Sequence, residues 1–534
     1  MQTDVLVIGS GGAGFAAALA AARAGAKVTL LERAKVFGGT TAWSGAQMWI
    51  PNNSLMKAAG LQDSREDALK YIKPLTLGRV PDELIEAYVD QAPRMVDWMM
   101  SEGMRLAALP LFPDYHAEFP GGKHGRSIEP RLFDTNRLGK WKDFLRPSPY
   151  DLAAEYSEIQ AWGGRTSMQG WDFELLAKRM QQGLTGWGRS GIGQMMDMCL
   201  KAGVTLVPGA RAVKLMRRGK RVAGAYVEKD GQKERYDARL GVILACAGFE
   251  WNPTLVHRFL GVPMTAPGSP PYNTGDGLLM SMEVGANLAN MTEHVGMVTM
   301  HIPGETSDGQ PLNRIMLHGV IYMPGSIVVN RAGKRFVDEA QNYNDMIKPF
   351  GTFEPVKFDY PNVPAYAVFD QKFRSKYVIG TVTPADITPP WVNESSSLAE
   401  LAKKIGVDPV GLQEQVAEFN KGAAQGKDPV FHRGAQIYDR HYGDKNIKPN
   451  PSLRPIDTPP YYGVEARFGS LGTKGGPITN AVGQVLDMHD QPIPGLYAAG
   501  NVAANVFGPS YPGAGATCGP AWTFGWLAGK HITS

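Results

Sequence analysis

Cysteine is scarce in this chain. Three cysteines, Cys199, Cys246 and Cys518, occur among 534 residues, and no two of them stand in a C-x-x-C spacing. A disulfide framework and a cysteine-based zinc site are therefore excluded, and we expect a protein of the reducing cytoplasm. The histidines form no cluster with metal-ligand spacing either, so no bound metal is expected.

Long apolar runs and runs of one charge are also missing. No uncharged apolar stretch reaches about 18 residues, and the sequence opens on a strand pattern without a basic segment before an apolar one. Neither a membrane span nor a secretion signal is expected, although peripheral membrane contact stays open. The net charge is only +4, with lysine and arginine scattered along the chain. Nucleic acid is therefore not an expected partner.

The remaining composition is that of a large globular protein. With 43% apolar residues over 534 positions, the chain can bury an extensive core and form one large or two interleaved domains. The 63 glycines and 39 prolines are spread along the sequence, which favours tight turns and pockets lined by backbone over disorder. We find no Ser-His-Asp motif and no P-loop.

The first forty residues predict a dinucleotide site. An apolar strand over 4–8 runs into a glycine turn over 9–14, an alanine-rich helix over 15–24 and a second parallel strand over 27–31. Gly9 permits the tight turn, Gly11 lets backbone approach a pyrophosphate, and Gly14 lets helix and strand pack closely. Glu32 follows at the position that binds a ribose hydroxyl, which favours FAD or NAD over NADP.

Later segments favour FAD over NAD. Small and hydroxyl-bearing residues follow Glu32 directly, so that a large cofactor can lie against the backbone. Two further segments, 242–249 and 495–501, each read as a buried strand that runs into a glycine, and they resemble the later cofactor contacts of flavoproteins. The predicted FAD-binding residues are Gly9, Gly11, Gly12, Ala13, Gly14, Glu32, Gly39, Thr40, Thr41, Ser44, Gly45, Gly248, Gly500, Asn501 and Ala516.

These segments lie near both ends of the sequence, so the cofactor domain is discontinuous. The predicted fold class is α/β (α+β). A Rossmann-like FAD-binding domain is expected from residues 1–290 and 466–534, with an inserted α+β substrate and catalytic domain over 291–465.

The segment 326–339 resembles the hallmark strand-turn-strand of the succinate dehydrogenase and fumarate reductase flavoprotein superfamily, together with Asn-Thr-Gly-Asp-Gly at 273–277. In that superfamily, enzymes of dicarboxylates carry arginines at two places where this chain has Tyr343 and Tyr511. With tyrosines in place of these arginines, the chain lacks the guanidinium groups that would bind a pair of carboxylates. The pattern instead resembles 3-ketosteroid Δ1-dehydrogenases, including Phe-Pro-Asp-Tyr at 112–115 and Tyr-Pro-Gly-Ala-Gly at 511–515.

This resemblance implies FAD-dependent α,β-desaturation of a 3-ketosteroid. The Tyr511 hydroxyl and the Gly515 N–H are candidates to polarise the ketone, as donors of an oxyanion hole. The resemblance gives the base role to Tyr343, with Tyr115 beside it to relay the proton. Because a free phenol has a pKa near ~10, Tyr343 needs help from a neighbour or acts at high pH. Tyr322 competes for the base role.

Three alternatives accompany this prediction. A smaller cyclic ketone would use the same tyrosine chemistry, and an enone reductase would run the same atoms backwards. A flavin-binding protein without turnover is the third. The electron acceptor is not specified by any motif; a quinone is one candidate, and no second dinucleotide motif indicates a nicotinamide.

Overall fold

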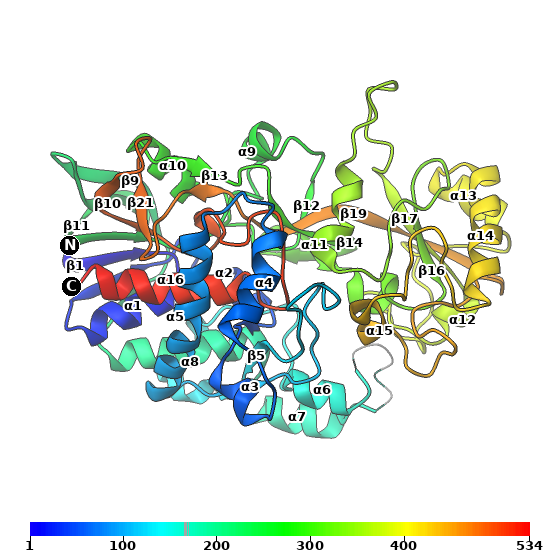
Figure 1. Cartoon of the computed structure of the whole chain (residues 1–534), viewed down its shortest axis with the longest axis horizontal. Coiled ribbons are helices and arrows are strands. Elements are labelled where there is room, and N and C mark those ends of the chain that lie inside the picture. The colour runs from blue at the N-terminus through cyan, green and yellow to red at the C-terminus, as the bar shows by residue number, and fades with distance from the viewer. Residues whose placement is uncertain (165–167, 169) are drawn as a thin grey trace.

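The structure is a computed structural model that describes residues 1–164, 168 and 170–534. Figure 1 shows two lobes side by side. One lobe holds both chain termini and a large sheet covered by helices, and the other is built around the long strands β14 and β19. The predicted α/β fold class is confirmed.

The first lobe is organised by an eight-stranded sheet whose central pairs are parallel. Val5, Leu6 and Val7 are fully buried, because both faces of the sheet are covered. Val5 and Val7 pack with residues of the following helix, and Leu6 packs on the opposite face with residues of an antiparallel extension of the sheet. A β-hairpin extension adds two antiparallel strands at β11. Along the sheet the strands are β21 (Gln484–Leu486), β22 (Pro492–Ala498), β11 (Gln232–Leu244), β1 (Gln2–Ile8), β2 (Val28–Leu31) and β8 (Thr205–Val207), with β10 (Arg221–Lys229) and β9 (Ala210–Arg218) beyond β11.

Helix α1 (Gly12–Arg23) follows β1 and packs against the C-terminal helix α16 (Cys518–His531). The approach is very close, since a Cβ on Gly525 would lie 2.4 Å from the Ala13 carbonyl oxygen and one on Gly529 would lie 2.3 Å from that of Ala17. This packing brings the N-terminal and C-terminal segments of the chain together beside the large sheet. The neighbouring helices are α4 (Arg65–Leu75), α5 (Asp82–Ser101) and α8 (Trp187–Lys201).

The second lobe contains a seven-stranded, largely antiparallel sheet. Its strands include β15 (Gln310–Ile315), β14 (His294–Ser307), β19 (Tyr461–Thr473), β17 (Ala365–Asp370) and β16 (Ser326–Val329), and α13 (Leu398–Ile405) and α14 (Pro409–Ala423) pack against it. After β16, the turn is fixed by a buried ion pair between Arg335 and Glu339, 2.6 Å apart. Asp428 contacts the same guanidinium at 2.8 Å.

Both lobes contribute short elements to the region between them: α2 (Gly39–Trp43), α11 (Tyr343–Met346) and α15 (Ile437–Tyr442). The predicted domain boundary at 465 falls inside β19, which belongs wholly to the second sheet. β12 (Ala266–Pro267) also pairs with β19, so that sheet takes residues from the segment assigned to the cofactor domain.

The other elements are short and connect these two sheets. They are β3 (Met48–Trp49), α3 (Ser54–Ala58), β4 (Leu106–Ala108), β5 (Ser127–Pro130), β6 (Phe133–Asp134), α6 (Tyr156–Ala161), α7 (Phe173–Gln181), β7 (Leu184–Thr185), α9 (Pro253–Leu255), α10 (Asp276–Glu283), β13 (Leu288–Ala289), α12 (Gln371–Arg374), β18 (Asn393–Ser395) and β20 (Gly476–Pro477). In the part of the chain that the structure describes, no helix has the length and apolar character needed to cross a bilayer.

The packing of α1 on α16 makes a prediction about stability. In an open helix, Gly525→Ala would stabilise the protein, because alanine favours helix more than glycine. Here the added methyl meets the Ala13 carbonyl, so we expect the free energy of unfolding to fall by about 1–3 kcal/mol in urea denaturation. Lys70→Ala, at an exposed site of α4, is the control and should change it by less than about 0.5 kcal/mol. A Gly525→Ala protein as stable as the parent would contradict this packing.

Candidate active site

The predicted glycine turn forms an open cradle. Gly9 has φ +105°, and a Cβ there would lie 2.3 Å from the Ala245 carbonyl oxygen, so only glycine fits the turn. By contrast, a Cβ on Gly11 or Gly39 would meet nothing closer than 3.5 Å and 3.7 Å, and both residues line the large cavity of this structure. The N-terminus of α1 opens onto this space, which suits an anionic phosphate group.

Glu32 is held in place at the end of β2. Its carboxylate accepts hydrogen bonds from the Ser10 N–H at 3.2 Å, the Ser10 hydroxyl, and the Ala34 N–H at 2.8 Å. The side chain is only 8% exposed, and its remaining exposure is to the cavity. A carboxylate fixed in this way still has lone pairs free to accept from ribose hydroxyl groups.

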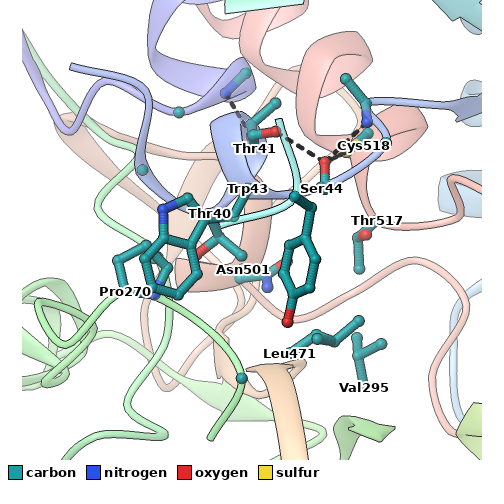
Figure 2. Close-up of a pocket in the computed structure, with 18 of the residues that line it drawn as sticks. Thr40, Thr41, Trp43, Ser44, Pro270, Val295, Leu471, Asn501, Thr517 and Cys518 are labelled. Atoms are coloured by element: carbon teal, nitrogen blue, oxygen red, sulfur yellow. Dashed lines mark hydrogen bonds between the residues drawn. The ribbon is translucent and has the colours of Figure 1, made fainter. Parts of the chain in front are cut away.

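The hydroxyl-bearing residues after Glu32 lie around the same cavity, as Figure 2 shows for Thr40, Thr41 and Ser44. Thr41 Oγ1 accepts from the Gly12 N–H at 3.1 Å, and Thr40 Oγ1 accepts from Asn273 at 2.9 Å. The Ser44 hydroxyl donates to the Thr41 carbonyl at 2.8 Å, which fixes the end of α2. These contacts order the wall of the cradle before any ligand is bound.

Most of the predicted cofactor residues line the cavity, and three do not. Gly14, Gly248 and Ala516 are absent from its wall. A Cβ on Gly14 would lie 1.9 Å from the Gly9 carbonyl oxygen, and one on Gly248 would lie 2.0 Å from Thr473 Oγ1, so both glycines serve close packing behind the wall. The predicted residues that do line it are Gly9, Gly11, Gly12, Ala13, Glu32, Gly39, Thr40, Thr41, Ser44, Gly45, Gly500 and Asn501.

Three tyrosines from distant segments meet at another part of the cavity wall. The ring centroids of Tyr115 and Tyr343 are 5.5 Å apart, those of Tyr343 and Tyr511 are 5.3 Å apart, and those of Tyr115 and Tyr511 are 5.5 Å apart. Tyr115 and Tyr511 are 3% and 5% exposed, and Tyr343 is half-buried. The structure thus brings together the three tyrosines that the sequence singled out.

Burial governs the acidity of these phenols. It raises the pKa of Tyr115 and Tyr343 well above the usual value, because the anion loses its hydration. The pKa of Tyr511 is raised for the same reason, and a hydrogen bond with the Thr517 hydroxyl at 3.2 Å opposes that rise. All three groups are therefore neutral hydroxyls near neutral pH, able to donate hydrogen bonds.

Tyr322, the competing candidate, lies outside this group. It is fully buried and does not line the cavity, and its hydroxyl is 2.9 Å from the hydroxyl of Tyr438. Tyr438 does line the cavity and packs on Tyr115 with ring centroids 4.7 Å apart. Tyr322 is thus separated from the cavity by Tyr438.

Gly515 follows Tyr511 in the C-terminal segment. It has φ +98°, and a Cβ would lie 2.2 Å from the Gln47 carbonyl oxygen, so no other residue fits. Among the described residues its N–H finds no protein acceptor, and the residue lines the cavity. A free backbone donor of this kind beside the Tyr511 hydroxyl is suited to bind a carbonyl oxygen.

The start of α16 also lines the cavity and was not predicted. Thr517, Cys518 and Ala521 contribute from its first turn, and Figure 2 shows Thr517 and Cys518 close to Ser44. A helix N-terminus carries partial positive charge and favours an anionic ligand. The sequence signal was the run of small residues leading directly into an apolar helix.

A buried lysine connects the segments that carry two of the tyrosines. Lys474 Nζ donates to the Ser510 carbonyl at 3.0 Å and to Asn344 Oδ1 at 3.3 Å, next to Tyr511 and Tyr343 respectively. The residue is 1% exposed, and burial lowers the pKa of Lys474 to about 7. Sequence reasoning missed it, because a single lysine has no local signature.

The shifted pKa of Lys474 predicts a pH-dependent stability. The unfolded chain, with a lysine pKa of about 10.4, binds more protons than the folded protein between pH ~7 and ~10, so this group makes the folded state more stable as pH rises through that range. Lys474→Met removes the effect. In urea unfolding, the parent should gain stability relative to Lys474→Met as pH increases. The exposed control Lys357→Met should show no such trend, and a difference for Lys474→Met that is independent of pH would contradict the assignment.

The geometry of Glu32 predicts a loss of cofactor affinity in Glu32→Ala. Removing the carboxylate deletes the acceptor for the ribose, and we expect FAD to bind at least about tenfold more weakly, as a lost charged hydrogen bond of about 1.5 kcal/mol implies. Flavin retained after ultrafiltration measures the effect. Glu228→Ala, on the exposed face of β10, should retain FAD as the parent does. Equal FAD retention in both variants would exclude the ribose contact.

Comparison with known proteins agrees with this geometry. A family described as FAD binding domain matches residues 4–518. The chain is 38% identical to 4-oxocyclohexanecarboxylate 2-dehydrogenase of Sinomonas cyclohexanicum, covering 99% of this chain and 92% of that protein. It is 37% identical to 3-oxosteroid 1-dehydrogenase of Mycobacterium tuberculosis, covering 99% and 98%.

A solved structure matches over the whole chain. The 3-ketosteroid Δ1-dehydrogenase of Sterolibacterium denitrificans, in complex with 1,4-androstadiene-3,17-dione, superposes with a TM-score of 0.90 at 35% identity, covering 100% of this chain and 99% of that one. The open cradle at Gly11 and Gly39 fits FAD, which is the cofactor of this protein. The chain belongs to the 3-ketosteroid Δ1-dehydrogenase family and is an FAD-dependent oxidoreductase acting on CH–CH bonds.

Proposed function

We propose that this protein removes hydrogen from the α and β carbons of a neutral cyclic ketone, with a 3-oxosteroid as the first candidate and 1,2-dehydrogenation as the reaction. The observation that carries this proposal is the meeting of Tyr115, Tyr343 and Tyr511 on one cavity with the FAD cradle. When bound, FAD supplies the acceptor for the hydride that leaves the β carbon.

The ketone oxygen is held by the Tyr511 hydroxyl and the Gly515 N–H. These donors lie on one rigid segment, since Lys474 holds the Ser510 carbonyl and Thr517 contacts the Tyr511 hydroxyl. They stabilise negative charge as it develops on the oxygen during loss of the α proton. Neutral phenols suit this role, and the raised pKa of Tyr511 keeps it protonated.

Tyr343 takes the α proton. It lines the cavity and is the most exposed of the three, and hydrogen bonds with the Tyr115 and Tyr511 hydroxyls raise its pKa further. Tyr322 is less suitable as the base because it is fully buried behind Tyr438. Tyr115 packs edge-on against Tyr343 and receives its proton as the α carbon loses one.

The charges of the cavity favour a neutral substrate. Among the described residues, the cations that line it are Arg33, Arg146 and Arg314. Each is paired: Arg33 with Asp276 at 3.2 Å, Arg146 with Asp308 at 2.8 Å, and Arg314 with both oxygens of Glu305. A substrate carboxylate would have to break one of these pairs. Apolar lining by Val295, Met297, Met316, Val320 and Leu471 suits a steroid skeleton.

A smaller cyclic ketone is the second candidate. It is favoured by the 38% identity to a protein named for 4-oxocyclohexanecarboxylate. The same tyrosines would act on it, because the chemistry involves only the ketone and its two neighbouring carbons. Reduction of an enone is the reverse reaction, and the partner that exchanges electrons with FAD decides between the two directions. We propose a quinone as the class of this partner.

The substrate is tested by anaerobic mixing of the FAD-loaded protein with a panel of ketones. We expect a 3-oxo-4-ene steroid to bleach the flavin absorbance faster than 4-oxocyclohexanecarboxylate, because every cation on the described part of the cavity wall already has a carboxylate partner. An artificial quinone or dye acceptor should restore the colour. Faster bleaching by the carboxylate would select the second candidate, and no bleaching by any ketone would refute the proposed reaction.

The roles of the two tyrosines are tested by removing one hydroxyl at a time. Tyr343→Phe should keep FAD and bind the ketone while losing about 10²- to 10⁴-fold in the rate of flavin bleaching. Tyr511→Phe should lose about 10²- to 10³-fold and bind the ketone more weakly.

The matched control is Tyr377→Phe, a buried tyrosine outside the cavity whose hydroxyl donates to Asp444 at 2.6 Å. It should bleach as the parent does. A fully active Tyr343→Phe enzyme would exclude Tyr343 as the base.

A further inference from the structure

A neutral tyrosine cannot act as a base unless its own proton leaves. Burial raises the pKa of Tyr343 and Tyr115 well above the usual value, so neither holds a stable phenolate at neutral pH. The proton must therefore pass to a group that is ionised there. The described residues behind Tyr115 contain such a group.

Two further tyrosines continue inward from the cavity. Tyr438 packs on Tyr115 with ring centroids 4.7 Å apart, and after burial Tyr438 is the largest influence on the pKa of Tyr115. The Tyr438 hydroxyl is 2.9 Å from the Tyr322 hydroxyl. Both residues are almost fully buried, at 1% and 0% exposed. A proton passing from Tyr115 to Tyr438 therefore requires rotation of a hydroxyl or one bridging water.

The series ends at two buried carboxyl groups. Asp439 follows Tyr438 on α15, and Asp338 ends the turn after β16; both act electrostatically on Tyr322. Asp439 Oδ2 accepts from the Gly434 N–H at 2.9 Å. Asp439 Oδ1 is buried and accepts no hydrogen bond within the described part of the chain. A buried carboxylate oxygen without a hydrogen-bond partner is rare in folded proteins, and a catalytic role such as receiving a proton is one reason for it.

We propose that Tyr438 and Tyr322 conduct the proton of the ketone from Tyr115 to the buried carboxyl pair of Asp338 and Asp439. This inference rests on the proposed function. Tyr438 and Tyr322 act on the reaction through Tyr343 and Tyr115, by passing on the proton that these two residues release. They are therefore positioning residues.

Protons and charges balance in the proposed transfer from the α carbon to the carboxyl pair. The α C–H bond breaks, its proton joins Tyr343, and its electron pair stays on the substrate as the enolate. The hydroxyl proton of Tyr343 moves to Tyr115, and one proton moves on in turn through Tyr438 and Tyr322. Each tyrosine is neutral before and after, and the carboxyl pair gains one proton.

The carboxyl pair is set up to hold and release that proton. Burial raises the pKa of Asp439 to about 6 and that of Asp338 well above its usual range, and the charge of Asp439 adds to the rise at Asp338. Arg433 opposes this rise but is engaged elsewhere, with Glu339 at 3.2 Å and the carbonyls of Ile321 and Met323 on either side of Tyr322.

The exposed residue Glu118 raises the pKa of Asp439, and its carboxylate accepts from the Ile437 N–H at the start of α15. In the proposed relay the proton leaves for solvent on this side of Asp439. Asp345, the carboxylate next to Tyr343, is not an alternative acceptor. His116 lies 3.0 Å from it and Lys348 3.2 Å, and they lower its pKa.

The relay predicts a characteristic pH profile. Asp439 accepts a proton only when it is deprotonated, so the rate of flavin bleaching by a saturating ketone should rise with pH through about 6 and then level off. In Asp439→Asn that step should vanish, the rate at pH ~7 should fall roughly 10- to 100-fold, and the rate should climb toward pH ~10. Asparagine keeps the acceptor for the Gly434 N–H.

The experiment is anaerobic stopped-flow on FAD-loaded parent, Asp439→Asn, Tyr438→Phe and Tyr322→Phe between pH ~5 and ~10. We expect all three variants to keep FAD and ketone affinity and to lose the step near pH 6. Tyr377→Phe, which removes a buried phenol that donates to a carboxylate outside the cavity, should keep the parent profile. Tyr322→Phe serves as the second relay variant if Tyr438→Phe fails to fold.

The outcomes separate this inference from the proposed function. A parent that bleaches, together with relay variants that keep its profile within about twofold, would overturn the relay and leave the reaction intact. An equal loss of bleaching rate in Tyr377→Phe would mean that the loss in the relay variants is a general packing effect, and would overturn the relay. A parent that is not bleached by any ketone would overturn the reaction and the relay together.

Discussion

The desolvation of phenol groups between the two lobes is the constraint on which the site depends. Tyr115, Tyr343 and Tyr511 come from three distant segments, and each is largely shielded from water in the folded chain. Loss of hydration holds them neutral, so each keeps the proton that it can donate to a carbonyl oxygen. The same effect leaves no stable phenolate to act as a base, which creates the need for an ionised group deeper in the protein.

The fold meets this constraint by fixing backbone segments. Lys474 fastens the residues beside Tyr343 and Tyr511 to each other. Tyr115 is attached to the same segment, since its N–H donates to the Pro512 carbonyl at 2.9 Å, and the Tyr71 hydroxyl donates to that oxygen at 2.7 Å. Three sequence segments thus share one small set of hydrogen bonds, and substrate binding finds donors already in place.

The sequence predicted the parts of this arrangement that have local signatures. The turn from Gly9 to Gly14 and the carboxylate of Glu32 follow from strand, helix and glycine spacing, and FAD as the cofactor is confirmed. Tyr343 and Tyr511 were singled out by resemblance, and their base and oxyanion roles stay predictions. Gly12 shows a limit of such reasoning, because a Cβ there would collide with Trp522, near the other end of the chain.

Other features depend on tertiary contacts that no local pattern encodes. Lys474 and Tyr438 are ordinary residues in the sequence, and only the folded chain sets them beside the cavity tyrosines. The domain boundary predicted at 465 falls inside β19 for a similar reason, since which sheet a strand joins is decided by its partners. Sequence reasoning also could not show that each arginine on the cavity wall is paired with a carboxylate, which bears on the charge of the substrate. These arginines are Arg33, Arg146 and Arg314.

The central claim is that a tyrosine hydroxyl on this cavity removes the α proton of a neutral ketone. The most direct measurement is the rate of anaerobic flavin bleaching by a 3-oxo-4-ene steroid. The steroid carries deuterium on the saturated carbon next to the ketone, C2, and is compared with the unlabelled steroid. We predict several-fold slower bleaching with the labelled steroid in the parent protein. Equal rates, with the label retained in the product, would contradict the account.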